Sequence, residues 1–220
     1  MRFRVLDPNE DLWSFNIEVK CGDILSLELN EIFSFIIEMD KLKSVLRKTK
    51  PVGLERYENT AEHSWQVCLL AHLLVERSTI SVDINRVVEI LLVHDIPEID
   101  AGDQILYEGR NADRTNKESE AAQRIFGLLP EPQAQWCMGR WQEYEERKTN
   151  EAMFAYAIDR LMPLLHNLNN NGQSWRENNV NLDKVLAFNA PIAEACPEIW
   201  DYLKGLLEQS LESGLFNKID

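Results

Sequence analysis

The chain has 220 residues, of which 45% are hydrophobic, so it is long enough to bury one large core and has the composition of a soluble globular protein. Its formal net charge of -14 argues against nonspecific binding to nucleic acid polymers and anionic membranes, which depends on Lys and Arg. The charge still allows an anionic small molecule to bind beside a local cationic patch or a metal. The four cysteines form no Cys-x-x-Cys pair and no apolar run reaches the ~18 to 20 residues that span a bilayer, so we expect a cytoplasmic protein without a zinc knuckle, disulfide framework or membrane span.

The first predicted element is an amphipathic helix over residues 27–47. Its apolar positions recur three and four residues apart, at Leu29, Ile32, Phe33, Phe35, Ile36, Met39, Leu42 and Leu46. It ends in a basic cluster formed by Lys41, Lys43, Arg47, Lys48 and Lys50. Cations at a helix C-terminus are favourable for the helix dipole alone, so this cluster has a structural interpretation beside a functional one.

A second helix is predicted to begin near Thr60. The residues Asn59-Thr60-Ala61-Glu62 have the form of a capping box and precede an apolar helical pattern. His63 therefore lies in the first helical turn, where it either satisfies a nearby carbonyl or serves as a ligand. The connector before this helix carries Arg56.

The third helix, for which Asp83 is the expected N-cap, leads into the stretch from Val93 to Asp103. Its apolar pattern places His94, Asp95 and Glu98 at the core, where a carboxylate must pair, change its pKa or bind a metal. These side chains are three and four residues apart and converge on one side of a helix. Pro97 ends or kinks that helix and leaves a wall for a pocket. The alternative is a chance His-Asp pair with Asp95 bound to an arginine.

The rest of the chain is predicted to be helical. Residues 102–113 are expected to form a polar loop, and helices are expected near residues 114–128, 130–147, 150–168, 182–189 and 197–213. Without alternating period-two runs, the chain is predicted to be all-α, with seven to nine helices. We expect one domain over residues 1–220, with its central part over residues 27–168 and C-terminal helices over residues 180–213 packed on it.

Asp159 is an anomaly within the helix predicted over residues 150–168. It shares its face with an otherwise core-like stripe of Ala152, Ala155, Tyr156, Met162 and Pro163. Arg160 points about a quarter-turn away and is not the obvious partner. Taken alone, the position of Asp159 favours a carboxylate satisfied by hydrogen bonds over a metal ligand.

Together, His63, His94, Asp95 and Asp159 give the order His, His-Asp, Asp over three helices. This pattern resembles the HD-domain superfamily of metal-dependent phosphohydrolases, which are helical bundles. Residues 56–64 and 94–103 are similar to the motifs Arg-x-Glu-Asn-x-x-Glu-His-Ser and His-Asp-x-x-Glu-x-x-x-Gly-Asp of its 5′-deoxynucleotidase branch. The resemblance covers residues 33–168. The branch has an arginine where Arg47 stands, but Lys48 replaces the neighbouring aromatic residue expected to help choose the sugar.

The resemblance implies a site for one divalent cation, which is Co, Mn, Mg, Ni or Zn, with His63, His94, Asp95 and Asp159 as ligands. Such a set leaves coordination positions for water and a phosphate oxygen. Glu98 is then expected to position or deprotonate the water and Asp103 to protonate the leaving group, although the roles are exchangeable. Arg47 and Arg56 are candidates for holding the phosphate, with structural salt bridges as the alternative.

The expected activity is phosphate release from nucleoside 5′-monophosphates. The alternatives are hydrolysis of another phosphorylated metabolite and a noncatalytic interaction module stabilised by metal. Glu98 and Asp103 favour catalysis, because a structural site requires ligands only. The resemblance also implies a homodimer, and Trp136, Met138 and Trp141 lie on a helix expected to expose an apolar strip.

Overall fold

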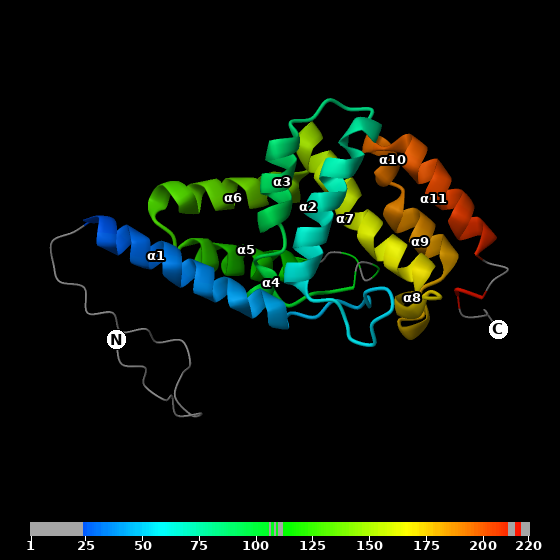
Figure 1. Ribbon diagram of the computed structural model, residues 1–220, viewed down its shortest axis with the longest axis horizontal. Coiled ribbons are helices and arrows are strands. Elements are labelled where there is room, and N and C mark those ends of the chain that lie inside the picture. Colours follow the sequence, from blue (N-terminus) through cyan, green and yellow to red (C-terminus); the bar gives the residue numbers. More distant parts are fainter. Residues whose placement is uncertain (1–23, 106, 108, 110–111, 211–213, 217–220) are drawn as a thin grey trace.

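The computed structural model describes residues 24–105, 107, 109, 112–210 and 214–216, and the regular elements within them are helices (Figure 1). The α-helices are α1 (Ile24–Glu38), α2 (Thr60–Leu74), α3 (Ile84–Val93), α4 (Glu98–Ala101), α5 (Ala112–Phe126), α6 (Glu131–Glu146), α7 (Asn150–Asn169), α8 (Gln173–Glu177), α9 (Leu182–Asn189), α10 (Ile192–Ala195) and α11 (Pro197–Gln209). Two 3-10 helices are η1 (Met39–Ser44) and η2 (Val75–Arg77). Eight of the α-helices have eight residues or more, so the all-α prediction is confirmed.

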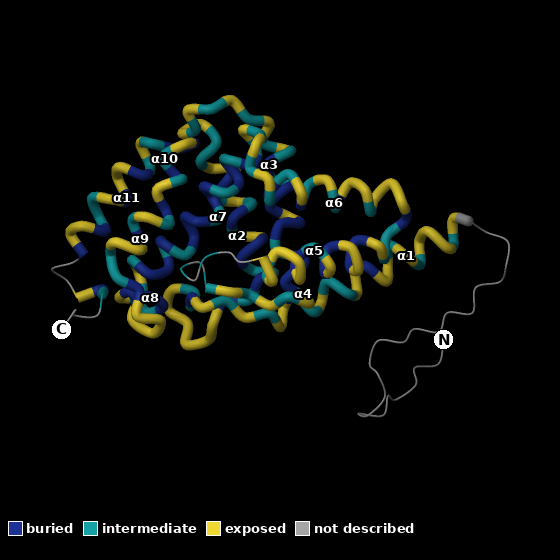
Figure 2. The backbone as a smooth tube through the Cα atoms, turned by 180° about the vertical axis from the view of Figure 1, so that it is seen from behind, coloured by how far each residue is buried: buried dark blue, intermediate teal, exposed yellow. Residues whose placement is uncertain are grey.

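Helix α7 is the centre of the fold. It contacts α2, α3, α6, α8 and α10, and its surroundings are the most deeply buried part of the backbone (Figure 2). Ala152, Ala155 and Met162 are buried there, which confirms the predicted core stripe. Because full burial of a large apolar side chain contributes about 1.5–3 kcal/mol, the interior around α7 holds this helix in a fixed rotation.

A second cluster of buried side chains lies beneath α1, α5 and α6. Helix α3 contributes to both clusters, because Ile90 and Leu91 belong to the cluster around α7 and Val93 belongs to the other. His94 follows Val93 directly. The end of α3 therefore lies where the two parts of the core meet.

Capping interactions fix the helix starts that lead to this junction. The Asn59 side chain accepts a hydrogen bond from the Glu62 N–H, and the Glu62 side chain accepts one from the Asn59 N–H, as the predicted capping box requires. Asp83 caps α3 by accepting from the N–H of Asn85. At the other end α3 stops at Val93, and the chain turns through Pro97 into α4, which confirms the predicted helix end.

The first helix ends earlier than predicted. The α-helix stops at Glu38 and continues as η1 to Ser44, so Arg47 lies in extended chain rather than in a last helical turn. The reason is a short antiparallel pairing, in which the N–H groups of Arg47 and Thr60 donate to the carbonyls of Glu58 and Val45 over 2.9 and 3.0 Å. This pairing places Arg47 beside the start of α2.

Two short helices, α8 and α10, were not predicted, and the last three residues of the helix expected over residues 197–213 lie outside the described residues. Helices α9, α10 and α11 contribute to the buried cluster around α7. The single-domain organisation stays a prediction. In the part of the chain that the structure describes, no helix combines the length and the apolar character needed to cross a membrane.

Candidate metal centre

The four residues predicted as metal ligands lie together. His63 comes from the first turn of α2, His94 and Asp95 follow α3, and Asp159 comes from the middle of α7. One donor atom from each of the four lies within 4.8 Å of the others. Nε2 of His63 lies 2.9 Å from Oδ1 of Asp159, and Nε2 of His94 lies 3.1 Å from Oδ2 of Asp95. Three helices that are distant in sequence thus deliver two imidazoles and two carboxylates to one point.

This donor set fits a divalent cation. Donor atoms ~2.1 Å from one cation lie about 3 Å apart when adjacent and about 4 Å apart when opposite. The four distances between an imidazole Nε2 and a carboxylate oxygen are 2.9, 3.1, 3.7 and 4.0 Å, the longest being that between His63 and Asp95. Nδ1 of His94 donates to the Leu91 carbonyl over 2.8 Å, which leaves Nε2 as the nitrogen for a ligand bond. Within the described residues this buried Nε2 has no hydrogen-bond partner.

Charge in the cluster is balanced between carboxylates and imidazoles. Burial alone would raise the pKa of Asp159, but the hydrogen bond with His63 and the charges of His94 and His63 hold that pKa well below its ordinary value. Burial would likewise lower the pKa of His94, but Asp95 and Asp159 raise that pKa well above its ordinary value. A cation bound here must displace the imidazole protons, so its affinity depends on pH.

The two carboxyl groups predicted to act on protons lie beside the cluster. Oε2 of Glu98, at the start of α4, accepts a hydrogen bond from Oγ1 of Thr60 over 3.0 Å. Burial and the charge of Asp95 raise the pKa of Glu98 well above its ordinary value. Burial, followed by Asp95, also raises the pKa of Asp103, whereas Arg47 counteracts this shift. Both side chains line the same cavity as His94, Asp95 and Asp159, and both have raised pKa values.

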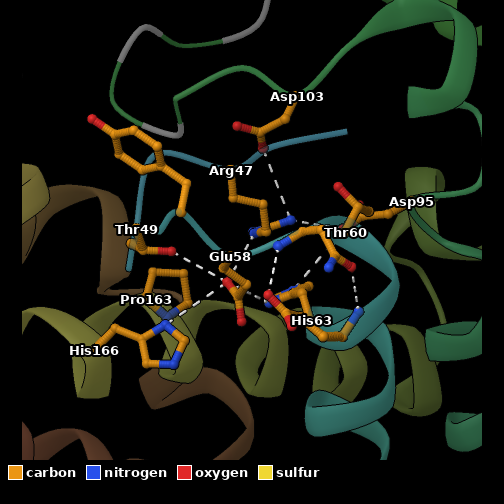
Figure 3. A network of polar contacts seen from close by, with 12 residues as sticks. Arg47, Thr49, Glu58, Thr60, His63, Asp95, Asp103, Pro163 and His166 are labelled. Atoms are coloured by element: carbon orange, nitrogen blue, oxygen red, sulfur yellow. Dashed lines mark hydrogen bonds and ion pairs between the residues drawn. The ribbon is translucent and has the colours of Figure 1, made fainter. Parts of the chain in front are cut away.

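The two arginines predicted to hold phosphate lie in different environments. Arg47 lines the cavity and donates from Nη1 to Oδ2 of Asp95 over 2.8 Å, with Asp103 at 3.9 Å (Figure 3). Arg56 is exposed, binds both carboxylate oxygens of Glu62 over 2.5 and 2.8 Å, and is not among the residues that line the cavity. For Arg56 the geometry therefore favours the salt-bridge alternative.

The cavity beside the cluster has a volume of about 410 Å³. This lies within the range of about 300–1,000 Å³ usual for small-molecule sites. Its aromatic lining consists of Tyr107, Trp141, Tyr144, Tyr156 and Phe188. A small molecule with one anionic end and one apolar or aromatic end matches this distribution of charged and aromatic groups.

Sequence reasoning missed two residues that support the cluster. Tyr144, buried on α6, donates its hydroxyl hydrogen to Oδ2 of Asp159 over 2.8 Å, and its ring lies edge-on to His94 at 5.0 Å. Thr60 is the buried donor to Glu98. The need of Asp159 for a partner is evident from its core position, but spacing alone does not identify Tyr144, which comes from another helix.

Comparison with known proteins adds family information to this geometry. Residues 39–200 match a family model described as HD domain. A solved structure described as a predicted metal-dependent phosphohydrolase from Magnetospirillum magnetotacticum MS-1 is 41% identical, with a TM-score of 0.81 over 87% of this chain and 100% of that chain. The PH0347 protein from Pyrococcus horikoshii OT3, 21% identical with a TM-score of 0.56 over 79% of this chain and 99% of that chain, supports the fold alone.

More distant similarity connects the chain to proteins named 5′-deoxynucleotidase HDDC2. The protein from Xenopus laevis is 25% identical over 60% of this chain and 68% of its own length. The protein from Homo sapiens is 27% identical over 51% of this chain and 54% of its own length. The chain thus spans about half to two thirds of these relatives.

Proposed function

The chain belongs to the HD-domain family of metal-dependent phosphohydrolases, and from this premise we propose that it releases phosphate from nucleoside 5′-monophosphates. One observation carries the proposal: Arg47, Glu98 and Asp103 line the same cavity as three of the four cluster residues, His94, Asp95 and Asp159. The relatives named 5′-deoxynucleotidase support a nucleotide as the substrate. The aromatic lining of the cavity suits the base of such a substrate.

We propose that His63, His94, Asp95 and Asp159 hold one divalent cation, which is Co, Mn, Mg, Ni or Zn. When bound, the cation would polarise the phosphoryl group and make water acidic enough to react near neutral pH. The guanidinium of Arg47, already desolvated in the cavity, offers paired donors that suit a phosphate group.

Glu98 and Asp103 are proposed to move the protons of the reaction. A carboxyl group exchanges protons most effectively when its pKa lies near the working pH, and both pKa values are raised by burial. Glu98, which the cluster does not require as a ligand, takes the proton of the attacking water. Asp103 then protonates the leaving oxygen of the nucleoside. These roles are exchangeable between the two carboxyl groups.

A second candidate function is hydrolysis of another phosphorylated metabolite. Lys48 lines the cavity at the position where the 5′-deoxynucleotidase motif led us to expect an aromatic residue. A flexible cation there favours a substrate with further anionic groups over selection of a deoxyribose ring. Fold alone does not decide between these substrates.

We also propose that the protein is a homodimer. Phe33 and Ile36 on α1 and Trp65, Leu69 and Leu73 on α2 are exposed, and the three on α2 repeat every four residues to form one stripe. Figure 2 shows that much of α1 is exposed. The strip expected on α6 is incomplete, because Trp141 is buried and only Trp136 of the two tryptophans is exposed. The faces of α1 and α2 are therefore the proposed contact surface.

A panel of phosphate esters tests the activity. Ribo- and deoxyribonucleoside 5′-monophosphates, sugar phosphates and a nucleoside diphosphate are each incubated with the protein and one of the five metals, and released phosphate is measured. We expect release that depends on the metal and is fastest with 5′-monophosphates. Release from sugar phosphates alone would support the second candidate, and no release from any ester would refute a catalytic function.

Glu98→Gln tests the division of roles. The amide keeps the shape and the hydrogen bond with Thr60 but removes the basicity, so kcat is expected to fall by ~10²- to 10⁴-fold. Metal content and KM should stay near wild type. Loss of metal together with activity would make Glu98 a ligand, and full activity would move the base to Asp103.

A further inference from the structure

A buried carboxylate lies behind the cluster, on the side away from the proposed cation. Glu58 precedes α2 and is fully buried, although an ionised carboxylate is costly to bury without partners. Its Oε2 accepts a hydrogen bond from Oγ1 of Thr49 over 3.2 Å. Nδ1 of His166, from α7, lies 3.7 Å from the same oxygen. Figure 3 shows Glu58 surrounded by these polar side chains.

The same carboxylate faces two residues of the proposed centre. Oε2 of Glu58 lies 3.6 Å from Nδ1 of His63 and 3.4 Å from Nε of Arg47. The other ring nitrogen of His63, Nε2, lies 2.9 Å from Asp159 inside the cluster. His63 thus lies between Glu58 and the cluster, with one nitrogen directed at each.

A histidine binds a cation through one nitrogen when the other carries a hydrogen. A carboxylate near that second nitrogen fixes the tautomer and the ring orientation and makes the ligand nitrogen more basic. The Leu91 carbonyl has the equivalent position for His94. For His63 this position is occupied by Glu58.

Arg47 is held by the same oxygen at its Nε. Because a guanidinium is planar, a partner at Nε restricts the direction of both terminal nitrogens. Nη1 then points at Asp95 and Asp103 in the cavity. We infer that Glu58 is a positioning residue that orients His63 toward the cation and Arg47 toward the phosphate. This inference rests on the proposed function of the cluster.

The test is a titration of the metal-free full-length protein with Co²⁺, followed by the visible absorption of the bound ion, for wild type and Glu58→Gln. The amide keeps the size of the side chain but removes its charge. The Kd for Co²⁺ is expected to rise about 10- to 100-fold, as is usual when the partner of a histidine ligand is removed. The KM for the substrate should rise as well, because Arg47 loses its restraint.

Glu143→Gln is the matched control. The Glu143 carboxylate is also nearly buried and accepts from an arginine and a threonine, Arg86 over 3.1 Å and Thr149 over 2.6 Å. It does not line the cavity. This variant should keep the wild-type Kd for Co²⁺. An equal loss of affinity in Glu143→Gln would show general destabilisation and overturn the inference.

Glu58→Asp keeps the charge but withdraws it from His63 by one methylene, so its Kd should lie between those of wild type and Glu58→Gln. If Glu58→Gln does not fold, the Kd of Glu58→Asp for Co²⁺ is the deciding measurement. A folded Glu58 variant with the wild-type Kd would refute the positioning role while leaving the proposed function intact. Failure of the wild type itself to bind any of the five metals would refute the proposed function, and the inference with it.

Discussion

Removal of one cluster carboxylate should greatly reduce the stabilisation of the protein by metal. A cation that binds only the folded chain at a free concentration 100 times its Kd stabilises that chain by about 2.7 kcal/mol. For a chain of 220 residues, each kcal/mol raises Tm by about 2–4 °C. The wild-type Tm should therefore rise by about 5 to 11 °C when the metal is added.

Asp159→Asn is the perturbation. The 2.9 Å between Oδ1 of Asp159 and Nε2 of His63 is the shortest imidazole–carboxylate distance in the cluster, and Oδ2 of Asp159 accepts a hydrogen bond from Tyr144. The amide of asparagine preserves the size of the side chain. Loss of a ligand should cost at least the ~100-fold in affinity that an outer partner can supply. The same metal concentration is then near the Kd of the variant, and the stabilisation falls to about 0.4 kcal/mol, or about 1–2 °C in Tm.

The assay is thermal unfolding with a chelator and then with each of the five metals. Asp201→Asn, at an exposed position on α11, serves as the control and should show the full wild-type shift. An equal Tm shift in wild type and Asp159→Asn would refute the ligand assignment. The absence of a shift with every metal would refute the metal site.

The size of this shift should also depend on pH. Burial alone would lower the pKa of His94, but Asp95 and Asp159 raise it, so the imidazolium stabilises the metal-free fold. That contribution is fully present below the unfolded pKa of ~6.5 and is lost as pH rises through the folded pKa. The metal displaces this proton, so the Tm shift should grow from about pH 6 to about pH 8. A shift that shrinks over this range would contradict the charge balance described for the cluster.

The two arginines, the cap of α2 and the exposed stripe on α2 each have an effect that can be measured. Arg47→Ala should raise the KM for the substrate by at least ~10-fold, because a hydrogen bond to a charged group contributes about 1.5–3 kcal/mol, whereas Arg56→Ala should leave KM unchanged; equal KM values in steady-state kinetics would contradict the placement of the two arginines. Asn59→Ala should lower the free energy of unfolding by about 0.5–2 kcal/mol in urea titrations, because α2 loses its cap, and an unchanged midpoint would show that the cap does not stabilise the protein. Sedimentation at micromolar concentration should give a dimer for wild type and a monomer for Trp65→Glu, and a monomeric wild type would refute the proposed assembly.

The place of each cluster residue in the fold could be predicted because it follows a local signal, whereas the assignment of the four as a ligand set rests on the family resemblance. The capping box fixes where α2 begins and hence the turn that carries His63. The Asp83 cap and Pro97 bound the segment that ends in His94. Helix periodicity identifies the face of α7 that carries Asp159. These signals place three buried helix faces but do not show that the faces meet, and Asp159 was joined to the other three residues only through the family resemblance.

The supporting residues could not be predicted in the same way. Tyr144 and Glu58 approach the cluster from other elements, and the distances between them and their partners depend on how the helices pack. Periodicity identifies the face of a helix but not the residue opposite it. The early end of α1 could not be predicted for the same reason. Residues 45–49 pair with residues 58–60, and the helical pattern of neither segment indicates this contact.

The sequence held a signal that distinguishes Arg56 from Arg47. Both lie at or near the connector before α2, and for each the sequence allowed two roles, phosphate binding or a structural salt bridge. The capping box places the carboxylate of Glu62 at the start of α2, where Oε1 accepts from both the Asn59 N–H and Nη1 of Arg56. Arg56 is therefore satisfied within six residues, outside the cavity. The side chains that surround Arg47 include Asp95, Asp103 and Asp159, which assemble only when α3 and α7 come together. Arg47 is the arginine whose terminal nitrogens face carboxylates from other helices, and it is the one that the tertiary structure brings to the site.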